Sequence, residues 1–209
     1  MTREAIRSSA VNRQISSLVH FTQAENLPGI MQHGLLSVTE AANRGLRPAI
    51  NDTLRLDGHR DGISLSIAFP NCRMFYRYRM MNPQIQWVVL IIDSSILWRN
   101  DCAYCRYNAA DARISSQPLV QLKTLAAFDS MFAEDEGQES HQRQQLNSFD
   151  PTDEQAEVLS FERIDPQYIT SVVFSNTETR NLYQNILAPR PVSINSAGRG
   201  YFASRSHER

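Results

Sequence analysis

The sequence is short of lysine, of cysteine and of long apolar runs, and each shortage narrows the class of protein. Lys123 is the only lysine, so arginine carries nearly all of the positive charge. The planar guanidinium suits bidentate contacts to phosphate or carboxylate, although a GC-rich genome would give the same bias. With 21 basic and 22 acidic residues the net charge is −1, which argues against a protein that holds duplex DNA mainly by general charge attraction.

The longest apolar run, WVVLII at 87–92, is far too short to cross a bilayer, so we expect no membrane partner. The N-terminus MTREAIRSSAVNRQ has no apolar stretch followed by small residues, as a secretory signal would have. We therefore expect a cytoplasmic protein. The length of 209 residues predicts a single domain over 1–209, with a core of about 17–202 and short flexible ends.

Cys72, Cys102 and Cys105 are the three cysteines, and an odd number in a chain that we expect to be cytoplasmic argues against a disulfide framework. Cys102 and Cys105 have the C-x-x-C spacing of a metal or redox site. A tetrahedral zinc site needs about four ligands, and no second Cys or His pair of suitable spacing follows. We interpret all three as ordinary thiols and expect no metal.

Alternating or β-rich segments predict strands, and amphipathic segments with capping residues predict short helices. The expected strands are 17–22, 62–69, 86–93, 156–161, 169–175 and 190–196, and the expected helices are about 26–34, 70–81 and 177–187. Regular crossover helices do not separate the strands. The pattern therefore favours an α+β fold with a mixed or antiparallel sheet over a doubly wound one.

The start of the first helix matters for the chemistry. Thr22 and Glu25 have capping-box spacing, but Pro28 is tolerated only in the first turn of a helix, which moves the start to about Asn26. The hydroxyl of Thr22 is then not needed as a cap and lies beside His20. Two stretches, 39–61 and 129–152, are predicted to be irregular, and long loops of this kind are usually functional or disordered.

Polar residues recur at positions i and i+2 at the ends of the predicted strands. Three pairs share this spacing: His20 with Thr22, Ser64 with Ser66, and Gln155 with Glu157. Side chains two apart on a strand face the same side. For any single pair, the solvent-facing side of a half-buried strand is a sufficient explanation. Together they predict three strand ends that present polar groups, with Glu157 pointing into a cleft.

The order of these motifs resembles the DarT family of NAD-dependent DNA ADP-ribosyltransferases, which are toxins of toxin–antitoxin systems. The matching segments span roughly 17–202: HFT with ENLPGIMQHGLL, ISLSIAFPNCRMFY, VVLII, QAEVL, ITSVVFS with its helix, and VSINSAGRGYF. The resemblance implies an ADP-ribosyltransferase-like fold, with a central mixed or antiparallel sheet flanked by short helices. It also implies NAD as co-substrate, single-stranded DNA as substrate, and an antitoxin partner with ADP-ribosyl-hydrolase activity.

On this resemblance, the H-x-T motif that contacts NAD falls on His20 and Thr22, and the catalytic glutamate falls on Glu157. A catalytic, NAD-binding arginine belongs in the loop before the second strand. Arg47, Arg55 and Arg60 compete for that place; Arg55 is favoured as the catalytic residue, with Arg47 as an NAD contact. The thymine-modifying branch has an aromatic second strand similar to HDYVPFYF, whereas this chain has RDGISLSIAF. It looks closer to the guanine-modifying branch.

The chemistry of the transfer suggests further residues. Glu157 can bond the ribose 2′-hydroxyl, stabilise positive charge at C1′ and accept a proton from the attacking base, while His20 donates to a ribose hydroxyl. The base must be unstacked, which favours single-stranded DNA. The additional candidate contacts are Ser64, Ser66, Phe75 and Tyr76 for NAD, Phe149, Gln155 and Arg143 for the substrate, and Arg73 and Arg77 for phosphates. The nearby Asp150, Asp153 and Glu154 are interpreted as solvated loop charges.

Two other functions remain open from the sequence. Gln155-x-Glu157 resembles the Q-x-E pattern of ADP-ribosyltransferases that modify protein side chains, and RNA is another conceivable acceptor. A catalytically inert nucleic-acid-binding module would use the same polar residues only to hold phosphates, but the near-neutral charge disfavours it.

Overall fold

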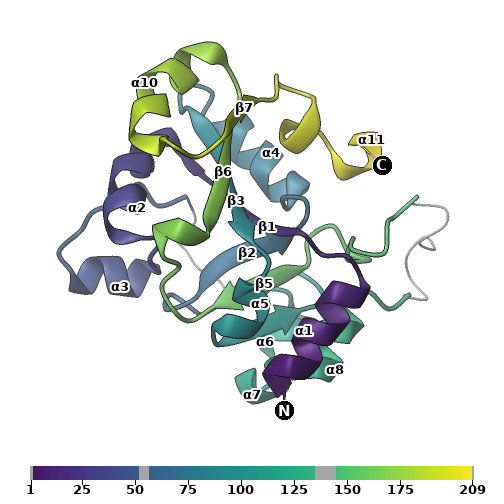
Figure 1. The fold of residues 1–209 in the computed structure, drawn as a ribbon. Helices are drawn as coiled ribbons and strands as arrows, with labels where there is room; N and C mark the ends of the chain where they lie inside the picture. Colours follow the sequence, from purple (N-terminus) through teal and green to yellow (C-terminus); the bar gives the residue numbers. More distant parts are fainter. Residues whose placement is uncertain (1, 52–56, 135–144, 209) are drawn as a thin grey trace.

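The structure is a computed structural model that describes residues 2–51, 57–134 and 145–208. These residues form strands β1 (Ser17–Gln23), β2 (Ile63–Ile67), β3 (Trp87–Asp93), β4 (Cys102–Cys105), β5 (Glu157–Ser160), β6 (Ile169–Phe174) and β7 (Val192–Ile194). They make one sheet in the order β4-β5-β2-β1-β3-β6-β7 (Figure 1), antiparallel throughout except for the parallel pair β6 and β7. The predicted α+β fold with a mixed sheet is confirmed.

Short helices cover both faces of this sheet. The α-helices in the described ranges are α1 (Thr2–Asn12), α2 (Leu27–His33), α3 (Val38–Asn43), α4 (Cys72–Met81), α5 (Ile96–Arg99), α6 (Ala112–Ser115), α7 (Leu119–Leu122), α8 (Leu125–Ser130), α10 (Thr177–Leu187) and α11 (Arg205–Glu208). Three 3-10 helices, η1 (Ala24–Asn26), η2 (Pro166–Tyr168) and η3 (Gly200–Phe202), accompany them. No helix in the described ranges has the length and apolarity needed to cross a bilayer.

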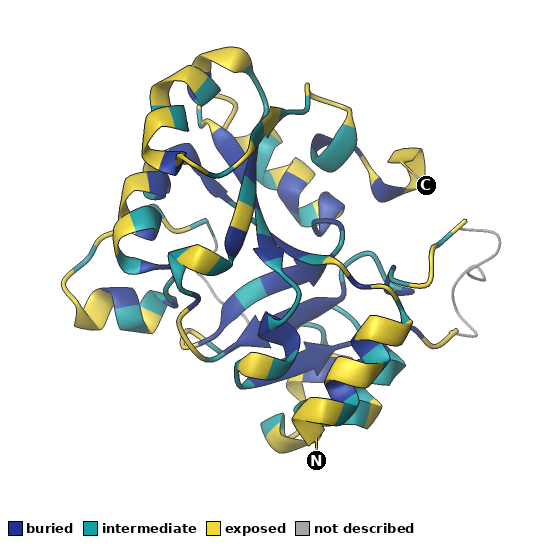
Figure 2. Ribbon diagram, viewed as in Figure 1, coloured by how far each residue is buried: buried dark blue, intermediate teal, exposed yellow. Residues whose placement is uncertain are grey.

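The strands of the sheet are largely buried (Figure 2), and its two faces carry different core clusters. The first face carries the main cluster, in which Leu18, Leu65 and Leu90 pack beneath α1, α2, α5, α8 and α10. The second face carries two smaller clusters, one around Val19 and Phe75 beneath α4 and η3, the other beneath α6 and α7. Strand residues alternate between the two faces because successive side chains point to opposite sides.

The sheet is weakly joined between β1 and β2. β1 pairs with β3 over seven residue pairs, from Ser17 opposite Asp93 to Gln23 opposite Trp87. β1 and β2, in contrast, share two registered pairs, Leu18 with Ile67 and Val19 with Ser66. The two strands separate beyond Val19, and this gap positions the candidate site.

Local sequence signals set most elements near the gap. Pro28 lies in the first turn of α2, and Gly34 ends that helix with φ +84°, as predicted. Asn71 caps α4, its side chain accepting a hydrogen bond from the Met74 amide.

Several elements were not predicted. The irregular stretch 39–61 begins inside α3, whose cap Ser37 accepts from the Glu40 amide. Residues 2–12 form α1 where a flexible end was expected, and Ile6 and Ala10 of this helix are buried in the main cluster. Most residues of α1 are polar, so packing of a few apolar side chains stabilises it more than intrinsic propensity does.

Candidate active site

A cavity of about 460 Å³ lies at the gap between β1 and β2, within the size range of small-molecule sites. Its lining combines residues of β1, η1, α2, α3, β2 and α4 with those of the segments that flank α3, of the loop 108–110 and of the start of β5. His20, Thr22, Ser64, Ser66, Arg47 and Glu157 are among the predicted site residues that line it.

The three polar pairs do not share one face of the sheet. Val19 pairs with Ser66, so Ser66 and Ser64 lie on the second face, whereas His20 and Thr22 alternate onto the first. Both sets line one cavity because the gap connects the two faces there. Strand alternation alone could not have shown this, since the meeting depends on where two strands part.

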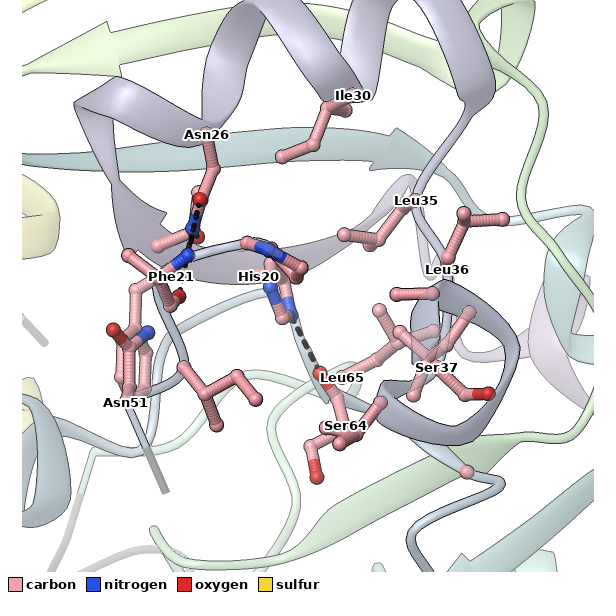
Figure 3. Close-up of a pocket in the computed structure, with 18 of the residues that line it drawn as sticks. His20, Phe21, Asn26, Ile30, Leu35, Leu36, Ser37, Asn51, Ser64 and Leu65 are labelled. Atoms are coloured by element: carbon pink, nitrogen blue, oxygen red, sulfur yellow. Dashed lines mark hydrogen bonds between the residues drawn. The ribbon is translucent and has the colours of Figure 1, made fainter. Parts of the chain in front are cut away.

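His20 crosses the gap with its imidazole. Its Nδ1 lies 2.8 Å from the carbonyl oxygen of Ser64 (Figure 3), just beyond the last registered pair of β1 and β2. A carbonyl only accepts, so Nδ1 carries the hydrogen, and in the neutral ring Nε2 is then an acceptor. Neutral His20 would therefore accept a hydrogen bond from a ribose hydroxyl, the reverse of the expected donor role.

The side chain of Asn26 links the segment at Ala49, which lines one side of the cavity, to the end of β1 by hydrogen bonds. Its Nδ2 donates to Thr22 Oγ1 (3.0 Å) and to the Ala49 carbonyl (2.9 Å), while its Oδ1 accepts from the Ala49 amide (2.8 Å). Beside it, Gln23 Nε2 donates to Asn51 Oδ1 (3.0 Å). Thr22, which is buried, thus bonds to Asn26 instead of offering the uncommitted hydroxyl that was expected. From the sequence, Asn26 was predicted only as the start of a helix.

The first-face end of the cavity is largely apolar. Ile30 of α2 and the following Leu35 and Leu36 approach it from one side, and Leu65 of β2 approaches from the other (Figure 3). A flat ring would bury apolar surface against such side chains, whereas Asn26 and His20, which line the same cavity, can bond hydroxyl groups.

Glu157 is the first residue of β5, 7% exposed and on the second face. Its Oε2 accepts from the Ala109 amide (2.7 Å) and from Asn108 Nδ2 (3.1 Å). Hydrogen bonds to a carboxylate are stronger than neutral ones, so this loop fixes the orientation of the side chain. Asn108, which also lines the cavity, was missed because nothing in the local sequence connects it to Glu157.

The loop before Glu157 differs from the prediction. Gln155 lies in a turn outside β5, its amide donating to Asp153 Oδ1 (2.7 Å), so the i, i+2 rule for strands does not place it beside Glu157. Asp150 is fully buried, not solvated, and its Oδ2 accepts from the amide and the side chain of Asn147. Glu154 pairs with Arg73 at the start of α4.

Three predicted aromatic contacts lie elsewhere. Phe75 is 1% exposed and stacks on Phe21 at 4.6 Å between ring centroids, so it belongs to the core. Tyr76 is 59% exposed on the outer side of α4. Phe149 packs against the main core cluster. From α4 and its cap, Asn71, Met74 and Tyr78 line the cavity.

The candidate arginines separate into three groups. Arg47 is exposed and lines the cavity. Arg60 is exposed in the turn before β2. Arg55, the favoured catalytic arginine, and Arg143 lie outside the described residues.

The cysteines are buried free thiols. Cys102 and Cys105 pack in clusters on opposite faces of the sheet, so they cannot hold one ion together. Burial raises the pKa of each to about 12. Within the described ranges no three His, Cys, Asp or Glu side chains come together as metal ligands.

Comparison with known proteins gives a family match and several structural matches. The family model for DarT, described as ssDNA thymidine ADP-ribosyltransferase, matches residues 19–202. No curated protein matches the sequence. The chain is similar to Thermosipho africanus DarTG in complex with ADP-ribose, with a TM-score of 0.59 and 18% identity over 90% of this chain and 51% of that one. It thus spans about half of the Thermosipho chain.

Two structures of Thermus sp. 2.9 DarT are matched over nearly their whole length. The complex with NAD+ gives a TM-score of 0.56 at 14% identity over 87% of this chain and 96% of that one. The complex with ADP-ribosylated ssDNA gives 0.52 at 14% identity, over 87% and 95%. At these identities the structures establish the common fold, and the family follows from the sequence match over most of the chain. The chain belongs to the DarT family.

Proposed function

We propose that this protein transfers ADP-ribose from NAD+ to a base in single-stranded DNA, with Glu157 as the catalytic residue. One observation carries the proposal: Glu157 is buried and held by two donors on a cavity that His20 and Thr22 also line. Membership of the DarT family supports it, as do the NAD+ and ADP-ribosylated ssDNA complexes of the Thermus relative.

The cavity has the chemical groups that NAD+ requires. The apolar end, with Ile30 and Leu35, can bury one face of a planar ring, and His20 and Asn26 can bond ribose hydroxyls. Arg47 at the rim supplies a guanidinium for the pyrophosphate. The chemistry of these residues supports NAD+ as the co-substrate.

In the proposed reaction the bond between ribose C1′ and the nicotinamide nitrogen breaks, and a nitrogen of the base forms the new bond to C1′. Positive charge develops on the ribose as nicotinamide leaves, and the carboxylate of Glu157 stabilises that charge. The attacking base loses a proton, which Glu157 accepts as general base. The products are nicotinamide and the ADP-ribosylated base.

The acceptor base is the finer part of the proposal. The second strand of this chain favours guanine, whereas the matched family is described by thymidine. Gln155, in the turn two residues before Glu157, is proposed to contact the acceptor. The exposed Arg77 on α4, a helix that also lines the cavity through Met74 and Tyr78, is proposed to contact a phosphate.

Mass spectrometry of oligonucleotides tests both levels of the proposal. The purified protein is incubated with NAD+ and four single-stranded oligonucleotides, each omitting a different base. We expect a mass gain of one ADP-ribose that disappears with one omission, and no gain with Glu157→Gln. Absence of an adduct on all four would contradict the proposal. Labelled NAD+ in a lysate would then show whether protein or RNA is the acceptor.

We further infer, from the family resemblance, a toxin neutralised by an antitoxin that hydrolyses the ADP-ribosyl bond. Expression of the protein in bacterial cytoplasm should arrest growth, and Glu157→Gln should not. Co-expression of an ADP-ribosyl hydrolase active on modified DNA should restore growth. Arrest that persists with Glu157→Gln would contradict this inference.

A further inference from the structure

Arg205 is a buried arginine in the C-terminal segment, three residues beyond the end of the family match at residue 202. It is 6% exposed, although the residues around it in α11 are exposed. Its Nη1 donates to the carbonyl of Pro151 (2.6 Å) and its Nη2 to the carbonyl of Thr152 (3.1 Å). A buried guanidinium is costly unless it is well bonded, so this contact constrains both partners.

The charge of Arg205 is balanced by the loop it holds. Burial lowers the pKa of Arg205 below its usual range, and the carboxylates of Asp150, Glu154 and Asp153 oppose that shift. Asp150 is itself fully buried beside the contact. The planar fork of an arginine matches two neighbouring carbonyl oxygens better than a single ammonium does.

The same loop is attached at other points. The Thr152 amide donates to the Met131 carbonyl (2.9 Å), and Thr152 Oγ1 donates to the Ala133 carbonyl (2.8 Å). Glu154 accepts from Cys72 Sγ (3.2 Å) and pairs with Arg73. Segment 150–154 is therefore held between the end of α8, the start of α4 and the C-terminal Arg205.

The segment that carries Arg205 is itself anchored. Phe202 is 1% exposed and packs on Phe75 at 5.3 Å between ring centroids. Arg79 Nη2 donates to the Phe202 carbonyl (2.9 Å). The contacts between η3 and α4 thus fix the segment from which the guanidinium of Arg205 reaches the loop.

The loop leads directly to the proposed catalytic residue. After Asp153, a turn closed by the Ala156 amide bonding to the Asp153 carbonyl (3.2 Å) is followed by Glu157 at the start of β5. Movement of Pro151 and Thr152 would shift this turn. The NAD-binding wall of His20 and Asn26 is built on β1 and η1 and lies outside this chain of contacts.

We propose that Arg205 is a positioning residue for the transfer: by holding the carbonyls of Pro151 and Thr152 it sets the turn that carries Gln155 and the orientation of Glu157. The inference rests on the proposed function. It assigns a role in the reaction to a residue that touches neither NAD+ nor the reacting carboxylate.

Steady-state kinetics on the full chain test the role. Arg205→Ala should lower kcat for transfer about 10-fold or more, because small misplacement of a catalytic group has large effects, while the KM for NAD+ changes less than about twofold. Arg205→Lys should recover part of kcat, since one ammonium cannot bridge two carbonyls as the planar fork does. Arg199→Ala, an exposed arginine of the same segment, is the matched control and should behave as the wild type.

Hydrogen exchange gives a direct readout of position. The amides of Thr152 and Ala156, both bonded within the loop region, should exchange faster in Arg205→Ala than in the wild type. If Arg205→Ala does not fold, Arg205→Gln keeps an amide donor and carries the same comparison.

The outcomes separate the two proposals. An active wild type with unchanged kcat in Arg205→Ala would overturn this inference alone. A second result would also overturn it: Arg205→Ala lowers kcat, NAD+ affinity and melting temperature together, and Arg205→Lys recovers none of them. That pattern would indicate a purely structural role. An inactive wild type would instead contradict the proposed function.

Discussion

The two sides of the cavity are built in different ways. His20 belongs to β1, which pairs with β3 over seven residue pairs along its whole length. Glu157 begins β5, a four-residue strand, and its carboxylate is oriented by Asn108 and Ala109 from a loop. The proposed NAD-binding side thus rests on a strand paired along its whole length, whereas on the proposed reacting side the carboxylate is oriented by a loop. Substitutions can therefore affect catalysis and NAD+ binding separately.

Glu157→Gln is expected to give the largest difference between the effect on kcat and the effect on NAD+ binding. The amide keeps the size of the side chain and an acceptor oxygen but removes the charge and the general base, so kcat should fall about 1,000-fold. The Kd for NAD+, measured by titration calorimetry, should change less than about threefold. Glu162→Gln, an exposed glutamate just after β5, serves as the control. A large loss of NAD+ binding in Glu157→Gln would show that the two sides of the cavity do not act separately.

Asn108→Ala removes a side-chain donor to the carboxylate of Glu157. We expect kcat to fall about 10- to 100-fold because the carboxylate loses part of its orientation, with little change in the KM for NAD+.

Asn100→Ala is its matched control, because Asn100 bonds to Ser160 and Glu162 at the other end of the same strand. It should lose stability in urea denaturation without losing kcat. Equal losses of kcat in Asn108→Ala and Asn100→Ala would show that loss of a contact at either end of β5 disturbs the whole strand.

His20→Ala tests the opposite side. Removal of the imidazole should weaken NAD+ binding about 10-fold, the value of one hydrogen bond of ordinary strength, and should lower kcat less than Glu157→Gln does. Exposed His207 provides the control substitution to alanine. Unchanged NAD+ affinity in His20→Ala would remove this residue from the proposed site.

The smallest kinetic effect is expected for Asn26→Ala. It frees the segment at Ala49 from the end of β1, so the KM for NAD+ should rise about threefold while kcat is kept. The free energy of unfolding should fall by about 1–3 kcal/mol, because buried partners lose their hydrogen bonds. Asn43→Ala on the exposed side of α3 should change neither. A lower kcat at unchanged KM would place Asn26 with the reacting side.

The sequence predicted elements whose signals are local. The strands at 17–23 and 87–93, the start and end of α2, and the cap of α4 at Asn71 all follow from periodicity and capping residues within a few positions. β4 was missed, because its four residues, Cys102–Cys105, become a strand by pairing with β5, more than fifty positions away in the sequence.

The same limit applies to the site. His20, Thr22, Ser64 and Glu157, which were predicted in this order along the chain, line the cavity, and their roles in binding and catalysis stay predictions. Asn108 is 49 residues from Glu157, and Arg205 is 53 from Thr152, so no local pattern could pair them. The aromatic run of α4 was misassigned because only packing decides that Phe75 faces the core and Tyr78 the cavity.

The bond from His20 to the Ser64 carbonyl replaces, with a side chain, the next rung that a backbone ladder would have formed between β1 and β2. The imidazole thereby joins β1 to β2 at the edge of the cavity, where the two strands separate. Any replacement for this residue must bond the backbone of a neighbouring strand and also make the proposed contact to NAD+. Few side chains can meet both requirements. A variant selected for altered co-substrate use would first need another contact that joins β1 to β2.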